Sequence, residues 1–330
     1  MPDVVPLVER GARRLFERMR DKRVLVVGDA MLDEWVWGRV SRISPEAPVP
    51  VVAVDDHSFT LGGAGNVASN LRAVGARVAF AAGIGDDAEG RRMLELLDAL
   101  EVDRSAVVAC SDRPTTRKTR IVAHNQQVVR ADWESVAPLA SADADRLCER
   151  VARLAAQCDA VVLSDYAKGL FSVQLVGAAR AAQVVTADPK PKNIGLFAGV
   201  TLVAPNAAEA SAASGVAIKD ADSLEEAGAA LLARLDCRYV VITLGERGMA
   251  LFGAQGERLV VPSVARTVFD VSGAGDTVIA VLTAALAAQA PVELALQLAN
   301  FAAGAGVEKL GTATASPEEI LALVGAEADA

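Results

Sequence analysis

The chain has little of the two residue types that most often bind transition metals or carry redox chemistry. It holds two histidines and four cysteines among 330 residues, and no two cysteines form a C-x-x-C pair. His57 and His124 are too few and too far apart for a zinc site or a histidine-based triad. We expect the four cysteines to be buried, reduced thiols, which is typical of a cytoplasmic protein. They are Cys110, Cys148, Cys158 and Cys237.

An excess of positive charge and long apolar runs are also lacking. The 33 lysines and arginines face 42 acidic residues, which gives a formal net charge of −9. This balance argues against a general nucleic-acid binder, although it leaves room for a local basic pocket. Residues 1–22 are charged and lack the apolar core of a signal peptide. No uncharged run reaches about 18 apolar residues, so we predict no membrane span.

Aromatic residues make up only 4% of the chain, whereas hydrophobic residues make up 52%. Apolar content that rests on Ala, Val and Leu suits helices packed on both faces of a parallel sheet. Repeated βα units, with polar residues after almost every strand, specify right-handed crossovers in such a sheet. We therefore predict one α/β domain over residues 1–330. Its strands are predicted at 23–28, 78–82, 160–164, 184–187, 201–204 and 239–243, and its helices include 88–100, 142–158 and 172–182.

Two segments, at about 35–60 and 105–132, interrupt this alternation. Prolines exclude a helix from 45–50, and 49–54 is typical of an edge strand, because proline cannot donate to a central ladder. Residues 117–122 and 127–132 predict a hairpin. We expect the two insertions to form a small β-sheet lid that covers one end of the main sheet.

The stretch D-V-S-G-A-G-D, from Asp270 to Asp276, follows a β-rich run at 267–269 and leads into a helix. Gly273 and Gly275 allow a tight turn, and the first amides of a helix are unpaired, so the stretch predicts an anion site. Asp276 would repel an anion there. It fits if it takes a proton from a hydroxyl that attacks a bound phosphoryl group. The alternative is a helix cap with an acidic first turn. The apolar face of the helix is predicted to be Val278, Val281, Leu282, Ala285 and Leu286.

Residues 63–68 satisfy G-x-G-x-x-A, a pattern found in dinucleotide-binding folds. That fingerprint should follow the first core strand, whereas this one follows the proline-rich segment. The glycines are equally compatible with an ordinary turn, or with a polar ligand that approaches the backbone beside Asn66.

Five motifs occur in an order that resembles the ribokinase-like, or PfkB-type, sugar kinases, over nearly the whole chain. They are Gly28-Asp29, the glycine segment through Asn66, N-x-x-E from Asn206 to Glu209, Thr243-Leu244-Gly245 with Gly248, and the stretch that ends at Asp276. The resemblance implies a ribokinase-like fold, with a mostly parallel sheet, helices on both faces and a β-lid. It also implies phosphoryl transfer from ATP to a sugar, with Mg²⁺ and a monovalent cation such as K⁺.

A narrower resemblance is to the kinases of D-glycero-β-D-manno-heptose 7-phosphate, which form the 1,7-bisphosphate for the lipopolysaccharide inner core. It rests on R-I-S-P-E-A-P-V-P from Arg42 to Pro50, S-D-Y-A-K-G from Ser164 to Gly169, and Asp188-Pro189-Lys190. The fused nucleotidyltransferase of many relatives carries an H-x-G-H motif. This chain has none, so we expect the free-standing form. Ser272 stands where the family commonly has threonine, and Gly65 where it has alanine.

The resemblance assigns roles to matching positions. Asp276 is the expected base, with Gly273, Ala274 and Gly275 around the migrating phosphoryl group. Asn206 and Glu209 are expected to arrange Mg²⁺ through water, with helix capping as the alternative for Asn206, and Asp270 is implied in a monovalent-cation site. The nucleotide is assigned to Thr243, Gly245, Gly248 and Asn300. The sugar is assigned to Asp29, Asp33, Gly62, Gly63, Asn66 and Asp188. Its 7-phosphate is assigned to Arg42, Arg117, Lys190 and Lys192, unless these are solvated surface charges.

Three other functions are compatible with parts of the sequence. An NAD-binding oxidoreductase would use residues 63–68, but would leave the other motifs unexplained. Another PfkB-type kinase, for a fructose phosphate, adenosine or a pyridoxal precursor, should lack the segment from Arg42 to Pro50. A non-catalytic nucleotide-binding regulator would normally have lost Asp276. We also expect a homodimer through the β-lid, because exposed lid strands often pair across two subunits in this family.

Overall fold

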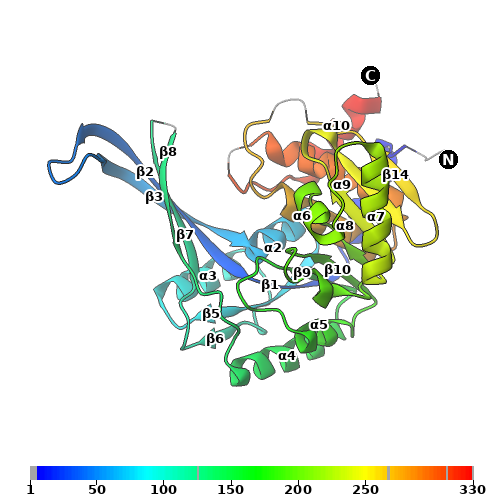
Figure 1. The fold of residues 1–330 in the computed structure, drawn as a ribbon, viewed down its shortest axis with the longest axis horizontal. Coiled ribbons are helices and arrows are strands. Elements are labelled where there is room, and N and C mark those ends of the chain that lie inside the picture. The colour runs from blue at the N-terminus through cyan, green and yellow to red at the C-terminus, as the bar shows by residue number, and fades with distance from the viewer. Residues whose placement is uncertain (1–5, 125, 266–267, 310, 329–330) are drawn as a thin grey trace.

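The computed structural model describes residues 6–124, 126–265, 268–309 and 311–328. Within these residues the chain builds an eight-stranded sheet with helices on both faces, a four-stranded sheet that projects from it, and a two-stranded sheet (Figure 1). The strands of the main sheet, in spatial order, are β14 (Arg258–Val261), β13 (Met249–Gly253), β12 (Tyr239–Thr243), β11 (Leu202–Val203), β10 (Val184–Asp188), β9 (Ala160–Ser164), β1 (Arg23–Gly28) and β4 (Arg77–Ala81).

The strands from β12 to β4 all pair in parallel, and each coincides with a predicted strand to within two residues. The prediction of a mostly parallel sheet is therefore confirmed. β13 and β14 add an antiparallel edge that was not predicted.

Alternate side chains of the parallel strands enter two separate cores. Along β1, Val24 and Val26 pack on one face and Leu25 and Val27 on the other, because successive side chains of a strand point in opposite directions. The first core is covered by α1 (Glu9–Met19), α2 (Ala64–Ala73), α3 (Ala88–Ala99), α8 (Ala274–Ala287), α9 (Val292–Val307) and α10 (Pro317–Ala328). The second is covered by α4 (Ser141–Ala155), α5 (Val173–Ala179), α6 (Ala207–Ser214) and α7 (Ala221–Leu235), with short 3₁₀ turns at Ile194–Phe197 and Gly245–Arg247.

The helix α8 differs from its prediction. It packs against β9 and β10 on one side and against α2 and α9 on others. As a result most of its side chains are buried, including Ile279 and Thr283 outside the predicted apolar face, whereas Leu286 is only half-buried. The β-rich run predicted before it is not a strand over Val268 and Phe269, which are exposed. Thr267 lies outside the described residues.

The four-stranded sheet forms an arm that stands away from the main sheet (Figure 1). Its spatial order is β3 (Pro50–Gly63), β2 (Ala30–Ile43), β7 (Thr116–Ala123) and β8 (Gln126–Trp133). The edge position of the proline-rich segment and the hairpin β7–β8 are confirmed.

Two bounds of the predicted lid differ from the structure. The first insertion was expected to begin at about residue 35, but β2 begins at Ala30 and includes Asp33, in a 14-residue strand rich in the aromatic and β-branched residues that favour strands. Residues Val108–Cys110 form β6, which pairs with β5 (Gly83–Gly85) in the two-stranded sheet and not with the arm. All four cysteines are free, but only Cys110 and Cys237 are buried, so the expectation of buried thiols holds for two of them.

Candidate functional site

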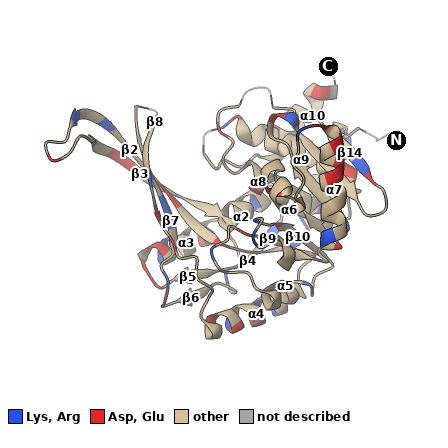
Figure 2. Ribbon diagram, in the orientation of Figure 1, with Lys and Arg blue, Asp and Glu red and all other residues tan. Residues whose placement is uncertain are grey.

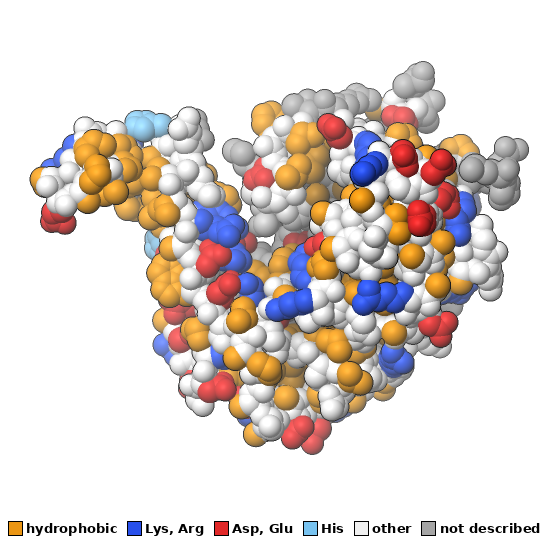
Figure 3. Space-filling model, in the orientation of Figure 1, with side chains coloured by type: hydrophobic (Ala, Val, Ile, Leu, Met, Phe, Trp, Pro, Cys, Tyr) orange, Lys and Arg blue, Asp and Glu red, His pale blue; other side chains and the backbone are white. Residues whose placement is uncertain are grey.

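The carboxyl ends of the parallel strands bring polar residues to one edge of the main sheet. Asp29 follows β1, Asp188 ends β10 and Thr243 ends β12. Ligands of open α/β sheets bind at such an edge. Segments of the ribbon that belong to charged residues occur near β9 and β10 and along the base of the arm (Figure 2). The surface is hollowed between the arm and the body, with Lys and Arg side chains on both sides of the hollow (Figure 3).

Asp276, the predicted base, lies buried in the first turn of α8. Its Oδ1 accepts a hydrogen bond from the Tyr166 hydroxyl at 2.6 Å, and its Oδ2 accepts one from the Asn66 side-chain amide at 2.8 Å. Burial raises the pKa of Asp276 to about 6, although these hydrogen bonds and the charge of Lys190 act in the opposite direction. Such a carboxylate is ionised at neutral pH and is a suitable proton acceptor.

The first turn of α8 presents free backbone amides next to this carboxylate. Gly273 has a φ of 81°, and a Cβ on it would lie 2.5 Å from the Asn66 side-chain nitrogen, so no larger residue fits. Ala274 was predicted to help hold the migrating phosphoryl group. In the structure its backbone amide already donates a hydrogen bond to the carbonyl of Val271. Among the described residues the amides of Gly275 and Asp276 have no backbone acceptor, as expected at a helix start.

The residues predicted to bind the nucleotide all line one cavity of about 450 Å³, a size typical of small-molecule sites. A smaller cavity, of about 130 Å³, contains Asp276, and Thr243 and Gly275 line both. The two cavities are therefore adjacent, with Thr243 and Gly275 between them. The lining of the larger cavity includes Thr243, Gly245, Gly248, Ala274, Gly275 and Asn300.

Asn206 and Glu209 form a reciprocal cap at the start of α6. The Asn206 side chain accepts from the Glu209 amide at 2.9 Å, and the Glu209 carboxylate accepts from the Asn206 amide at 3.0 Å. The other Glu209 oxygen accepts from Lys190 Nζ at 2.6 Å. The capping alternative for Asn206 is therefore confirmed, and it places Glu209 in the cavity that contains Asp276.

Lys190 and Asp188 face the same small cavity. Burial raises the pKa of Asp188 to about 8, against the lowering effect of Lys190. Burial also opposes the charge on Lys190, but the carboxylates of Asp188 and Glu209 outweigh it and raise the Lys190 pKa. Lys190 is therefore a fixed cation beside the predicted base.

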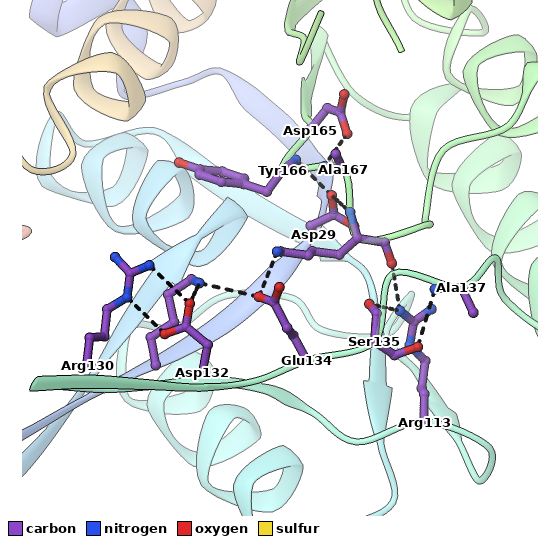
Figure 4. A network of polar contacts seen from close by, with 12 residues as sticks. Asp29, Arg113, Arg130, Asp132, Glu134, Ser135, Ala137, Asp165, Tyr166 and Ala167 are labelled. Carbon is purple, nitrogen blue, oxygen red and sulfur yellow. Dashed lines mark hydrogen bonds and ion pairs between the residues drawn. The ribbon is translucent and has the colours of Figure 1, made fainter. Parts of the chain in front are cut away.

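The residues predicted to bind the sugar fall into two positions. Asp29 is buried, and one of its oxygens accepts from the backbone amides of Tyr166 and Lys168, so it fixes the loop after β9 (Figure 4). Burial raises the pKa of Asp29 to about 6. Asp33 projects from β2 and accepts from Arg120.

Gly62 and Gly63, at the end of β3, lie in close contact with Asp33 and Asp29. A Cβ on Gly62 would lie 2.3 Å from the Asp33 carboxylate, and one on Gly63 would lie 2.6 Å from the Asp29 carbonyl. Both positions therefore require glycine for the close approach of β2 and β3 at the base of the arm.

The four cations predicted to hold a distal phosphate do not gather at one point. Lys190 donates a hydrogen bond to Glu209, and Arg117 donates one to Glu89. Lys192 donates one to the carbonyl of Ala167. Arg42 is exposed near the outer end of β2. Because three of the four have separate partners and Arg42 stands apart from them, their contacts do not support one phosphate site built from all four.

Three cations with no role predicted from the sequence contact Asp33 or Glu134. Arg120 bonds Asp33 and stacks over Trp35, with 5.0 Å from its guanidinium carbon to the ring centre. Lys118 on β7 lies opposite Asp33 on β2 in the register of the two strands, so both side chains are on one face of the arm. Lys168 reaches the same oxygen of Glu134 as Lys118, at 2.6 and 3.4 Å. Figure 4 shows the part of this network around Glu134, between Asp132 on β8 and the loop after β9.

Asp270 is held by backbone amides. Its two oxygens accept from Ser272 at 2.9 Å and from Gly311 at 3.0 Å. Burial opposes its ionisation, but these bonds outweigh that effect and lower the pKa of Asp270. A carboxylate whose pKa is lowered is ionised at neutral pH, and is chemically suited to a monovalent cation.

Tyr166 is the residue closest to the predicted base that sequence reasoning left without a role. The only signal was its position after a buried strand, within the motif from Ser164 to Gly169.

Within the described residues, no group of three or more histidine, cysteine or acidic side chains is placed to hold a metal ion. None of the described helices is long and apolar enough to cross a membrane.

Comparison with solved structures supports the fold. The chain is similar to ribokinase from Arabidopsis thaliana complexed with ribose and ATP, with a TM-score of 0.72 and 20% identity over 92% of this chain and 99% of that one. It is also similar to phosphofructokinase-2 from Escherichia coli in complex with potassium, with a TM-score of 0.79 and 20% identity over 93% of this chain and 99% of that one. The predicted ribokinase-like fold is confirmed.

Comparison with curated proteins gives higher identities. "Bifunctional protein HldE" of Pelobacter propionicus is 44% identical over 93% of this chain and 64% of its own length. The protein of the same name from Geobacter metallireducens is 44% identical over 96% of this chain and 66% of its own length. The chain thus spans about two thirds of these relatives. Residues 21–319 match the profile described as "pfkB family carbohydrate kinase". The chain belongs to this family and is a carbohydrate kinase, an enzyme that transfers a phosphoryl group to a sugar.

Proposed function

We propose that the enzyme phosphorylates the anomeric hydroxyl of D-glycero-D-manno-heptose 7-phosphate with ATP and forms the 1,7-bisphosphate, a step towards ADP-heptose and the lipopolysaccharide inner core. The observation that carries this proposal is the 44% identity to bifunctional HldE proteins across 93% of the chain. Identity to the ribokinase and phosphofructokinase-2 structures is 20%. The segment from Arg42 to Pro50, which the narrower resemblance singled out, supports the same substrate.

In this proposal Asp276 takes the proton of the sugar hydroxyl as its oxygen attacks the γ-phosphorus of ATP, and ADP leaves. Two features support the role: the carboxylate is buried with its pKa raised to about 6, and its cavity shares the lining residues Thr243 and Gly275 with the larger cavity. Such transfers have loose transition states, so the protein mainly positions the reactants and stabilises charge.

The amides of Gly275 and Asp276 are proposed to hold the migrating phosphoryl group. They lie at the positive end of α8, and the Cβ position of Gly275 has no neighbouring atom within 4 Å, which leaves room for a ligand. Loss of one such donor typically costs about 2.7–4 kcal/mol of barrier. Lys190, which lines the same small cavity, is proposed to neutralise charge on this group.

Asn206 and Glu209 would hold Mg²⁺ through its water ligands, since this ion keeps much of its hydration shell. Their position in the cavity of Asp276 fits the requirement, because oxygen donors there face the space between the nucleotide cavity and the base. The ion would supply charge neutralisation for the ATP phosphates. Asp270 would similarly serve a monovalent cation.

Asp29, Asp33, Asn66 and Asp188 are proposed to surround the sugar. For its distal phosphate we infer a position between the arm and the loop after β9. Lys118 and Lys168 contact one oxygen of Glu134 there, and Arg120, two residues along β7 from Lys118, contacts Asp33; these acids hold the three cations in place. Arginine and lysine are the usual ligands of such a dianion.

The deciding experiment is an ADP-release assay across sugar phosphates, with the product identified by ³¹P NMR. We expect turnover with heptose 7-phosphate, a new anomeric phosphate signal, and little turnover with fructose 6-phosphate. The reverse preference would refute the heptose assignment and favour another kinase of the same family. Asp276→Asn is the matched control, because it keeps the side-chain shape while removing the base.

We also propose a homodimer through the arm. Its strands carry exposed apolar side chains, including Ile43, Val54 and Trp133, and edge strands of this kind readily pair with a second chain. Light scattering after size-exclusion chromatography measures the mass directly. A monomer at assay concentration would contradict the proposal.

A further inference from the structure

Tyr166 contacts the proposed base but has no role in the mechanism described so far. It lies in the loop after β9, and its hydroxyl is 2.6 Å from Asp276 Oδ1. The two residues are 110 positions apart in the sequence. A contact of this length to a buried carboxylate is a charge-assisted hydrogen bond, which is about twice as strong as a neutral one.

The loop that carries Tyr166 is held rigidly. Asp29 accepts from the amides of Tyr166 and Lys168. Asp165 accepts from the amide of Ala167 with one oxygen and from that of Lys190 with the other. Ala167 has a φ of 60°, a left-handed conformation that residues other than glycine rarely adopt. Two carboxylates therefore maintain a strained loop, and the position of the Tyr166 ring follows from it.

The chemistry fixes the direction of the hydrogen bond. A carboxylate can only accept, so the Tyr166 hydroxyl donates to Asp276. Burial, followed by the charges of Asp276 and Asp188, raises the pKa of Tyr166 well above its ordinary value, so the phenol keeps its proton. Each carboxylate oxygen accepts two hydrogen bonds, which leaves Asp276 able to receive a sugar hydroxyl as well.

We propose that Tyr166 is a positioning residue for phosphoryl transfer, because its hydroxyl orients the carboxylate of Asp276 and keeps it ionised at neutral pH. This inference rests on the proposed role of Asp276 as base. Other groups influence the same carboxylate and stay in place when Tyr166 alone is changed. They are the Asn66 amide on α2, Asp33 on β2, Asp188 and Lys190 at the end of β10, and Glu209 on α6 beyond Lys190.

The first test is the pH dependence of kcat/KM in Tyr166→Phe. Loss of a hydrogen bond to the charged form should move the acidic limb upward by about one pH unit. At pH values on that limb, kcat/KM of Tyr166→Phe should be about tenfold lower than that of the wild type. At alkaline pH the loss should be smaller. Tyr239→Phe is the matched control. Tyr239 opens β12 at the end away from Thr243, and its replacement should leave the limb unmoved. A limb that stays in place, or moves downward, in Tyr166→Phe would overturn the proposal.

A second test does not depend on turnover. The chain has two tyrosines, so 3-fluorotyrosine incorporated into Tyr239→Phe labels Tyr166 alone. Its ¹⁹F resonance should titrate with the midpoint of the acidic limb, and the titration should disappear when Asp276→Asn is added. A resonance that ignores the ionisation of Asp276 would overturn the proposal even if Tyr166→Phe folds poorly.

The two tests separate this inference from the proposed function. If Asp276→Asn keeps the full rate of the wild type, the base assignment itself is wrong. If the acidic limb exists and vanishes in Asp276→Asn, yet does not move in Tyr166→Phe, the base assignment stands and only the role of Tyr166 fails.

Discussion

Replacement of Asp276 by asparagine should stabilise the protein while it greatly slows catalysis. Burial raises the pKa of Asp276 from 3.8 to about 6, so the folded state disfavours the ionised carboxylate. Each pH unit is worth about 1.36 kcal/mol, and the rise therefore corresponds to about 3 kcal/mol of lost stability. The loss is absent below about pH 4, where both states are protonated, grows between about pH 4 and pH 6, and is complete above that range.

Asparagine fits the site without a buried, unpaired polar atom. Its carbonyl oxygen can accept from the Asn66 amide, as the carboxylate does now, and its N–H group can donate to the Tyr166 hydroxyl, which also accepts. The free energy of unfolding of Asp276→Asn should therefore exceed that of the wild type by up to about 3 kcal/mol at pH 8, and by little at pH 4. At the same time kcat should fall by about 10²–10⁴-fold, the usual contribution of a general base.

Urea denaturation of both proteins at several pH values measures this difference. Asp270→Asn is a control of identical chemistry and opposite sign. Hydrogen bonds to Asp270 outweigh its burial and lower its pKa, so its ionised form stabilises the fold. That variant should lose stability at neutral pH, and the deficit should shrink as the pH falls through the acidic range. A stability difference for Asp276→Asn that is independent of pH, or largest at acidic pH, would refute the reasoning.

Two further substitutions test the surroundings of the base. Gly62→Ala places a Cβ 2.3 Å from the Asp33 carboxylate, so KM for the sugar should rise about tenfold with KM for ATP unchanged; equal effects on both constants would contradict a local role. Lys190→Met removes a charge that lowers the pKa of Asp276, so the acidic limb of the rate profile should move to higher pH. A limb that stays in place would show that Lys190 does not act on the base.

Much of the fold was predictable because its elements have strong local signals. The buried strands are short apolar runs with polar residues at their carboxyl ends, and all six predicted core strands occur. The start of α8 was predictable from its two glycines. The strand β2 was not predictable, because its sequence mixes polar and apolar residues without a clear alternation. Its first residues are buried against the body, whereas the later ones are exposed in the arm. The burial of α8 on nearly all sides was underestimated, since a small-residue helix gives little contrast between its faces.

By itself, the sequence determined which residues end each strand, and therefore which acids stand at the active edge of the sheet. It also determined the order of motifs that identified the kinase family. The tertiary structure alone decided which of these residues meet: Asp276 with Asn66 and Tyr166, from positions 210 and 110 residues away, and Lys190 with Glu209 instead of with Arg42. The reason is physical. Periodicity reports how a side chain is oriented on its own element, whereas contacts between elements depend on the strand order and on the register of the arm, which no local pattern encodes.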